Sequence, residues 1–586
     1  MAHAPCTKNP MDRALNRRQL LLGASVASGG SALSTYFPAW AQPVSAGIAA
    51  PLATVGGPEI ALRIARQTMS FDGRTSQAIG INGTIPGPLL RLREGQNVRL
   101  RVTNDLAEDS SIHWHGLLVP AAMDGVPGVS FPGIKARSTF IYEFQVKQAG
   151  TYWYHSHSGL QEQLGHYGPI VIDPAGKDPV NADREHVVVL SDHSQMAPDA
   201  IFRKLKQQPG YFNYQKQTLG GLIAGKDQSL GQRVEWANMR MDPTDIADVT
   251  GATYTYLING HGPNDNWTAL YAPGQRVRLR IINASAMTTF DVRIPGLPLT
   301  IVQADGQNVR PTTVDEFQIG VAETYDVIVV PRDNRAYTIV GESIDRSGMA
   351  RATMAPRTGM AADVPLLRSR PLATMTDMGM DMSGMQGMKG MDHAGMNHAE
   401  TSMNMRDSKN APSVVMSPGV QTISPMPKDR TGDPGQGLDE VGHRVLNYRD
   451  LIAFDRNPDV RAPSRSIDVH LTGNMERFMW SFDGVKMSDM MQPIPFRQGE
   501  RVRVNLINDT MMGHPIHLHG HFFELVTGRG DHAPRKHTVI VQPGGKVTFD
   551  LTADAVGDWA FHCHLLYHMH AGMMRVVSVR PAGGGQ

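Results

Sequence analysis

The chain has few cysteines, few aromatic side chains and almost no net charge: 2 Cys, 6% Phe, Trp and Tyr, and a formal charge of +1 over 586 residues. The balanced charge gives no reason to expect nucleic acid or an anionic membrane as a partner. Beyond the N-terminal segment no run of 18 or more apolar residues occurs, so the sequence predicts no transmembrane helix. A chain of this length is too long for one hydrophobic core and predicts several domains.

The N-terminus is typical of an export signal. Arg17 and Arg18 precede an apolar run at 20–27, and Ala39-Trp40-Ala41 offers a cleavage site between small residues. Paired arginines before a weakly apolar core favour the twin-arginine route, which exports folded proteins. We therefore interpret 1–41 as a twin-arginine-type signal peptide.

Removal of that signal would leave a single cysteine. Cys6 lies in the signal, and Cys563 cannot form an internal disulfide without it. An unpaired thiol in an oxidising compartment is a liability unless the protein uses it. The neighbours of Cys563 are His562 and His564, and both are potential metal ligands. The sequence is rich in such side chains, with 23 His and 33 Met.

One pattern occurs three times along the chain, at 94–104, 273–283 and 498–508. Each copy is a glycine turn followed by alternating apolar and polar residues, which is the period-two pattern of a half-buried strand. Many short β-branched runs bounded by Gly, Pro, Asn and Asp surround these copies, and long helical periodicity is scarce. The pattern predicts an all-β protein of three consecutive Greek-key β-sandwich domains.

The spacing of the copies predicts the domain boundaries. We place the first domain at 55–178, the second at 183–355 and the third at 440–582. The stretch 356–439 contains no Phe, Trp or Tyr and is rich in Gly, Pro, Ser and Met. Such a segment buries too little apolar surface to offset its ordering entropy. We interpret it largely as a Met-rich flexible linker or surface loop.

Histidines two residues apart recur near both ends of the chain. On a strand, such residues point to the same face, so each pair presents two imidazoles side by side to a metal ion. One pair arises easily by chance, whereas four together predict a metal cluster. The motifs are His113-Trp114-His115, His155-Ser156-His157, His517-Leu518-His519 (with His514 three residues earlier) and His562-Cys563-His564.

The ligand types indicate copper. His514, Cys563, His568 and Met573 can supply the two imidazoles, one thiolate and weak axial thioether of a blue copper electron-transfer site. A zinc site would require further cysteines or a carboxylate and would not explain the other imidazoles. Because Cys563 lies between two histidines, an electron that reaches its sulfur can pass to a neighbouring metal cluster through a few covalent bonds.

With these motifs the chain resembles the multicopper oxidases, which include laccases, ascorbate oxidase and ceruloplasmin, over nearly the whole mature sequence. The resemblance implies three cupredoxin-like domains, of which the second lacks ligands, and four copper ions that reduce O2 to water. It also implies a ligand for each site: His514, Cys563, His568 and Met573 for the type 1 copper; His113 and His517 for the type 2 copper; His115, His155 and His564 for one type 3 copper; and His157, His519 and His562 for the other.

Within that family the chain is most similar to bacterial periplasmic copper-resistance oxidases of the copper-resistance protein A type. The residues that carry this similarity lie at 471–477, 480–484 and 562–574, together with the Met-rich stretch. The similarity implies a periplasmic protein. Thioether sulfur selects Cu(I), so we expect auxiliary copper binding in the stretch, although a compositionally biased linker without ligands is the alternative. The expected ligands are Met375, Met378, Met380, Met382, Met385, Met388, Met391, His393, Met396, His398, Met403 and Met405.

Asp124 is the one catalytic residue that the resemblance implies besides the ligands. It matches an acidic residue near the copper cluster in the family, where it would relay protons or orient a water. The alternative is a plain turn aspartate before Gly125. In some relatives an acidic residue follows the second blue-copper histidine, but this chain has Met569 there.

The favoured function is oxidation of Cu(I) to the less toxic Cu(II), with O2 as the electron acceptor. A laccase-like oxidation of phenols or catechols at the edge of His568 is an alternative, and a periplasmic copper store with little turnover is another. A copper nitrite reductase is disfavoured, because eight cluster histidines suit O2. The expected partners are O2, Cu(I) or small reductants, and other periplasmic copper-handling proteins.

Overall fold

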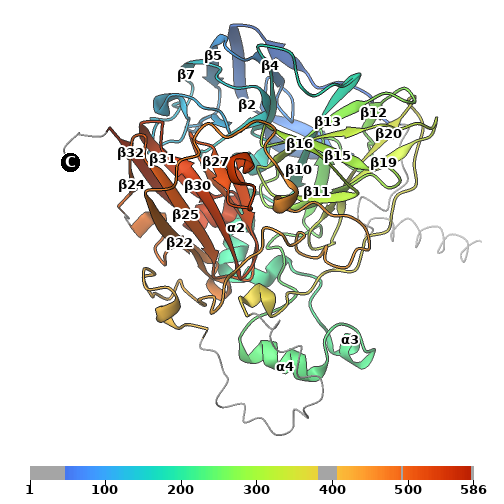
Figure 1. Ribbon diagram of the computed structural model, residues 1–586. Helices are drawn as coiled ribbons and strands as arrows, with labels where there is room; N and C mark the ends of the chain where they lie inside the picture. The colour runs from blue at the N-terminus through green and yellow to red at the C-terminus, as the bar shows by residue number, and fades with distance from the viewer. Residues whose placement is uncertain (1–46, 381–404, 490–491, 582–586) are drawn as a thin grey trace, which may run out of the picture.

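The computed structural model describes residues 47–380, 405–489 and 492–581, so the predicted signal peptide lies outside the described residues. The described strands form six sheets, which pair into three β-sandwiches (Figure 1). The predicted all-β fold of three cupredoxin-like domains is confirmed. No helix in the described ranges is both long and apolar enough to cross a bilayer.

Domain one consists of two sheets, with strand orders β1-β4-β9-β8-β6 and β3-β2-β5-β7. Its polar and apolar residues alternate as the sequence predicts, and β5 exposes every second side chain over most of its length. The strands are β1 (Thr54–Gly56), β2 (Glu59–Phe71), β3 (Arg74–Ile81), β4 (Leu89–Arg93), β5 (Asn97–Asn104), β6 (His113–His115), β7 (Thr139–Gln145), β8 (Gly150–His155) and β9 (Tyr167–Asp173).

Domain two has the sheet orders β11-β10-β13-β18-β15-β16 and β12-β20-β19-β14-β17. Three helices, α2 (Pro198–Gln207), α3 (Leu219–Ile223) and α4 (Leu230–Asn238), are inserted after its first strand. The strands are β10 (Arg184–Ser194), β11 (Tyr254–Ile258), β12 (Thr268–Leu270), β13 (Val277–Asn283), β14 (Phe290–Arg293), β15 (Leu299–Ala304), β16 (Gln307–Val314), β17 (Glu316–Ile319), β18 (Thr324–Val329), β19 (Tyr337–Ser343) and β20 (Met349–Ala355).

Domain three has the sheet orders β23-β22-β25-β30-β27-β28, with β21 beside β30, and β24-β32-β31-β26-β29. One short helix, α5 (Leu566–Ala571), follows β31. The strands are β21 (Lys428–Asp429), β22 (Arg465–Asn474), β23 (Met479–Phe482), β24 (Ile494–Arg497), β25 (Arg501–Asn508), β26 (His514–Leu518), β27 (Phe523–Leu525), β28 (Arg535–Lys536), β29 (Thr538–Val541), β30 (Gly545–Thr552), β31 (Gly557–Cys563) and β32 (Met574–Arg580).

The threefold sequence pattern corresponds to one strand in each domain. β5, β13 and β25 each pair in parallel with a long early strand of their domain and antiparallel with a later one. Each ends in an asparagine, and the Nδ2 atoms of Asn104, Asn283 and Asn508 donate hydrogen bonds to main-chain carbonyls four or five residues later, in the loop that follows each strand. The repeated asparagine therefore fixes the same turn in all three domains.

The middle copy differs from its prediction in one respect. β13 is buried along its whole length instead of half-buried. Its arginines lie in the interface with domain one, where Arg278 contacts Asp178 at 2.8 Å and Arg280 donates to Thr151 at 3.0 Å. Paired charges can be buried at such an interface, so the polar side of the alternation does not reach solvent.

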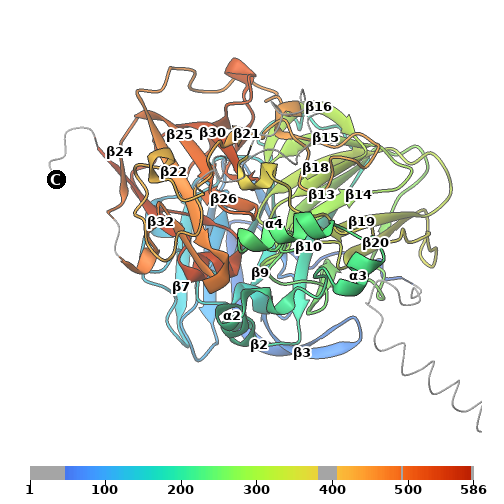
Figure 2. The ribbon, with the colours of Figure 1, turned by 90° about the horizontal axis from the view of Figure 1, so that it is seen from below.

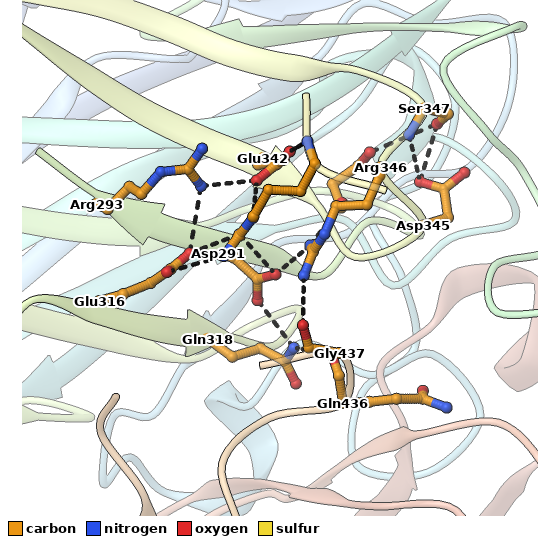
Figure 3. Close-up of polar contacts among 12 residues, drawn as sticks. Asp291, Arg293, Glu316, Gln318, Glu342, Asp345, Arg346, Ser347, Gln436 and Gly437 are labelled. Atoms are coloured by element: carbon orange, nitrogen blue, oxygen red, sulfur yellow. Dashed lines mark hydrogen bonds and ion pairs between the residues drawn. The ribbon is translucent and has the colours of Figure 1, made fainter. Parts of the chain in front are cut away.

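The described parts of the segment at 356–439 make more contacts than a flexible linker would. Its described parts have almost no regular structure, yet they are tied to domain two by hydrogen bonds such as that between Arg346 and Gly437 (Figure 3) and by partly buried ion pairs. Arg368 binds Glu342 at 2.7 Å and Glu316 at 2.7 Å, and Arg346 donates to the Gly437 carbonyl at 3.1 Å. A few charged residues thus anchor a chain that has no aromatic side chains, which composition alone does not show.

Helices α3 and α4 lie at the bottom of the molecule as drawn in Figure 1, and in the view from below α4 lies in front of the strands (Figure 2). Its Trp236 is buried in a cluster with Ile246 of domain two and Met511 of domain three. Domains two and three therefore meet closely, and residues far apart in sequence can share a site between them.

Candidate metal centres

The first two histidine motifs lie on neighbouring strands of domain one. His113 and His115 occupy both ends of β6, and β6 pairs antiparallel with β8, so that His113 is opposite His155. His157 follows two residues after the last residue of β8. The strand period turns the paired histidines toward one face of the sheet, and that face is turned to domain three.

The other two motifs lie on adjacent strands of domain three. β26 pairs antiparallel with β31, which places His517 opposite His562 and Ile516 opposite Cys563. His519 and His564 continue one residue past their strands. The register therefore brings two imidazoles together on one side, while the thiol of Cys563 points into the domain core, where it is fully buried.

The eight histidines gather into three groups whose ligand atoms lie within 4.8 Å of one another. Each group combines side chains from domains one and three. Two groups are the same trios that the family resemblance implies for the coupled coppers, and the third joins the two predicted type 2 ligands with one further histidine. The groups are His115, His155 and His564; His157, His519 and His562; and His113, His115 and His517.

The ring nitrogens inside these groups fit metal ions. Six of them are buried and make no hydrogen bond: His113 Nε2, His115 Nδ1, His155 Nε2, His157 Nε2, His517 Nε2 and His564 Nε2. The remaining two, His519 Nε2 and His562 Nε2, face each other at 3.1 Å. A buried polar atom without a partner costs free energy, and metal ions would satisfy all eight at once.

The opposite nitrogens of these rings are held by the protein. His517 Nδ1 donates to the His537 carbonyl at 2.7 Å, and His113 Nδ1 donates to the Asp124 carbonyl at 2.7 Å. His115 is reversed, because its Nε2 contacts Thr538 Oγ1 at 3.2 Å and leaves Nδ1 toward the group. These contacts select the ring nitrogen that faces the centre.

The electrostatic environment keeps seven of the eight imidazoles neutral, as metal binding requires. Burial is the main cause, and repulsion between neighbouring rings adds to it. The pKa values of His115, His155, His157, His517, His519 and His564 are lowered well below the ordinary value, and that of His562 is lowered to about 4.

A separate group lies inside domain three. Cys563 Sγ is 3.6 Å from His514 Nδ1 and 3.9 Å from His568 Nδ1, and these two nitrogens are 3.2 Å apart. Met573 is fully buried, and its carbonyl accepts a hydrogen bond from the Cys563 amide at 3.1 Å. Burial raises the pKa of the Cys563 thiol. A bound metal would oppose that effect, since it favours the thiolate.

The two histidines of this group are oriented from outside. His514 Nε2 contacts Thr510 Oγ1 at 2.8 Å, and Trp480 stacks on the His568 ring with 3.8 Å between centroids. His568 Nε2 contacts Asp248 Oδ2 of domain two at 2.7 Å, and the carboxylate is almost fully buried. The sequence predicted that domain two supplies no metal ligand. The contact of Asp248 with His568 could not be found from the short motifs, because Asp248 lies in a different domain from His568.

Asp124 of domain one lies against a histidine of domain three. It is fully buried, and its Oδ2 accepts a hydrogen bond from His519 Nδ1 at 2.9 Å. The next residue, Gly125, has φ +85°, and a Cβ there would lie 1.9 Å from the Ile112 carbonyl oxygen. Only glycine fits this turn, so the backbone is shaped to deliver the carboxylate to His519.

Four of the twelve residues predicted to bind auxiliary copper lie within the described ranges. Met375, Met378, Met380 and Met405 pack in the cluster around Trp236, with four methionines that the sequence analysis did not single out: Met239, Met241, Met475 and Met511. The remaining predicted residues lie outside the described residues, namely Met382, Met385, Met388, Met391, His393, Met396, His398 and Met403. Eight of the twelve residues in this cluster are methionines, an unusual composition for an apolar core.

Comparisons with known proteins agree with this geometry. Sequence models described as multicopper oxidase match residues 63–177, 185–363 and 461–583. The chain is 47% identical to copper resistance protein A of Escherichia coli, over 96% of this chain and 99% of that protein. It is 30% identical to a multicopper oxidase of Mycobacterium tuberculosis, over 96% and 97% of the two chains. The structure resembles a multicopper oxidase of Campylobacter jejuni, described as a metallo-oxidase, with a TM-score of 0.59, 18% identity and coverage of 92% and 96%.

Proposed function

The chain belongs to the multicopper oxidase family, and from that premise we propose that it is a periplasmic copper-resistance enzyme that oxidises Cu(I) to Cu(II) and passes the electrons to O2, which leaves as water. The observation that carries this proposal is the position of Cys563. Its sulfur faces His514 and His568, while its sequence neighbours His562 and His564 reach two different histidine trios. A single short peptide thus links an electron-accepting site to a cluster that can collect several electrons.

We assign four copper ions to these groups. When bound, copper would supply reversible one-electron chemistry at the first site and would bind and reduce O2 at the cluster. The assigned ligands are His514, Cys563, His568 and Met573 for the type 1 ion; His113 and His517 for the type 2 ion; His115, His155 and His564 for one type 3 ion; and His157, His519 and His562 for the other.

Other side chains orient the ligands and handle protons. Thr510 and Asp248 hold the Nε2 atoms of His514 and His568, which leaves both Nδ1 atoms for the metal. Asp124 Oδ1 makes no hydrogen bond within the described residues. We assign it the role of holding a proton or a water beside His519 during turnover.

The surroundings of His568 favour Cu(I) over phenols as the reductant. A phenol would dock against an exposed edge of this ring, but His568 is fully buried beneath Trp480, and Asp248 covers its Nε2. The methionine cluster shares Ile246 and Ile344 with the cavity that Asp248 lines. Soft thioethers near the blue-copper site suit a Cu(I) donor.

The first experiment is O2 uptake by the copper-loaded mature protein with Cu(I) as the only electron donor. We expect rapid uptake by the wild type and none by Cys563→Ser. Uptake with a phenol but not with Cu(I) would shift the substrate to organic molecules. No uptake with either donor, from protein with its full copper content, would identify a copper store and refute the oxidase proposal.

A second experiment tests the methionine cluster. Leucine keeps the volume of methionine but lacks the soft sulfur, so Met239→Leu combined with Met241→Leu should raise KM for Cu(I). Met69→Leu, which replaces a methionine packed against another part of the core, is the matched control. An unchanged KM in the double variant would remove these sulfurs from the proposal.

Export is proposed from the N-terminal arginines. Replacement of both Arg17 and Arg18 with lysine should retain the protein in the cytoplasm, because the twin-arginine route reads the arginine pair. Fractionation of cells that express each form measures this. Normal export of the double variant would point to a different route.

A further inference from the structure

Glu162 lies beside the trinuclear cluster and has no role in the scheme above. It begins a short 3-10 turn, η3 (Glu162–Leu164), which follows the second histidine motif. Its carboxylate is almost fully buried, and Oε2 lies 2.8 Å from His155 Nδ1. That nitrogen also lies 3.1 Å from the Ser156 carbonyl oxygen. The Nδ1–H of His155 therefore has two acceptors, and one of them is an acid.

We propose that Glu162 is a positioning residue that holds His155 with Nε2 toward the copper assigned to His115, His155 and His564, and that its negative charge strengthens copper binding there. This inference rests on the copper sites proposed above. A carboxylate behind a ligating imidazole fixes the ring and raises its basicity. His155 Nε2 is the buried atom without a hydrogen bond that would gain from both effects.

Hydrogen bonds from the residues on either side of Glu162 hold this turn in place, so the Glu162 carboxylate has a fixed position. On one side, Gln161 Oε1 accepts from Ser110 Oγ at 2.8 Å. On the other, Gln163 Nε2 donates to Asp192 Oδ1 of domain two at 3.2 Å. These glutamines already anchor the turn, and Glu162 itself is not needed for that purpose.

A charged Glu162 would lack a compensating cation in the protein. Among the described residues, no lysine or arginine forms an ion pair with it, and its Oε1 makes no hydrogen bond. Burying a carboxylate in this way is costly. A copper ion on the far side of the His155 ring would supply the missing positive charge, which gives a physical reason for an acid at this position.

The arrangement parallels that of Asp124 on the other trio. Asp124 Oδ2 is 2.9 Å from Nδ1 of His519, and Glu162 Oε2 is 2.8 Å from Nδ1 of His155. His519 and His155 belong to the trios assigned to the two type 3 ions. Each of these trios thus has one imidazole backed by a buried carboxylate.

The test is Glu162→Gln, which keeps the shape and one acceptor oxygen but removes the charge. Copper per chain is measured after dialysis against graded concentrations of a chelator, and thermal unfolding is measured with and without copper. We expect the affinity for one copper to fall by about 10- to 100-fold, the range found for partners of metal-bound histidines. The unfolding temperature of the copper-free protein should stay within a few degrees of the wild type, since no protein cation loses its partner.

Asp345→Asn is the matched control, because Asp345 is a buried carboxylate of domain two, away from this turn, that accepts hydrogen bonds from the Ser347 amide and hydroxyl. It should lower the unfolding temperature equally with and without copper. Equal copper retention by Glu162→Gln and wild type, or an equal loss of stability in both forms, would overturn the positioning role. If the wild type itself holds no copper beyond the site at Cys563, the proposed function fails together with this inference.

Discussion

Lys536 is a fully buried lysine, and its removal should destabilise the protein severely. It lies on β28, and its Nζ is 3.0 Å from Asp305 Oδ1 and 3.1 Å from Glu323 Oε1, both fully buried in domain two. Burial by itself would lower the pKa of Lys536, but the two carboxylates outweigh it and raise that pKa. The lysine is therefore charged and balances two acids at the interface of domains two and three.

The magnitude follows from what Lys536→Met leaves behind. Removing one partner of a buried ion pair costs about 3–5 kcal/mol, because the remaining charge is uncompensated. For a domain of about 150–250 residues, this loss corresponds to a drop in unfolding temperature of roughly 6–20 °C. The copper site should loosen as well, since Asp305 Oδ2 accepts from the Thr538 amide at 3.1 Å, and Thr538 contacts His115 and His517.

Thermal unfolding of the copper-free protein is the assay, and Lys546→Met on β30, which removes a half-buried lysine of the same domain, is the control. The control should change stability by no more than about 0.5 kcal/mol. The triple variant Asp305→Asn, Glu323→Gln and Lys536→Met has no buried charge in this group, so it should recover most of the loss. A Lys536→Met protein that unfolds within about 1 kcal/mol of wild type would refute this reasoning.

Three further outcomes are expected. Burial would raise the pKa of Glu185, but Arg280 at 2.9 Å and Arg91 lower it to about 2. The stability that the charged Glu185 contributes is therefore present above its ordinary pKa of 4.5 and is lost as pH falls toward 2. Glu185→Gln should flatten that part of an acid-unfolding curve. In Gly125→Ala the new Cβ should clash with the Ile112 carbonyl oxygen, so the yield of soluble, copper-loaded protein should fall severalfold. An unchanged copper content per chain would contradict this clash. Removal of copper by a chelator should lower the unfolding temperature, and re-addition should restore it, because bound ions stabilise the folded form; an unchanged melting curve would count against copper at the cluster.

The local features of this protein could be predicted from its sequence because they depend on neighbouring residues. The strand period places His113 and His115 on one face, whatever the rest of the fold does. The repeated pattern became β5, β13 and β25, since alternation and a glycine turn are local signals. The proposed role of Cys563 as the link between two sites also follows from its immediate neighbours.

The contacts that join the domains were decided only by the tertiary structure. Asp248 reaches His568, and Lys536 reaches Asp305, across more than two hundred residues of chain. The composition of 356–439 did not predict that partly buried arginine–carboxylate pairs, such as Arg368 with Glu342, hold its described parts in place. Periodicity reports which face of a strand is buried, but not which domain covers that face. The sequence by itself determined the metal-binding motifs and the repeated strands. Packing decided which acids stand behind which histidines, because long-range contacts depend on the whole folded chain.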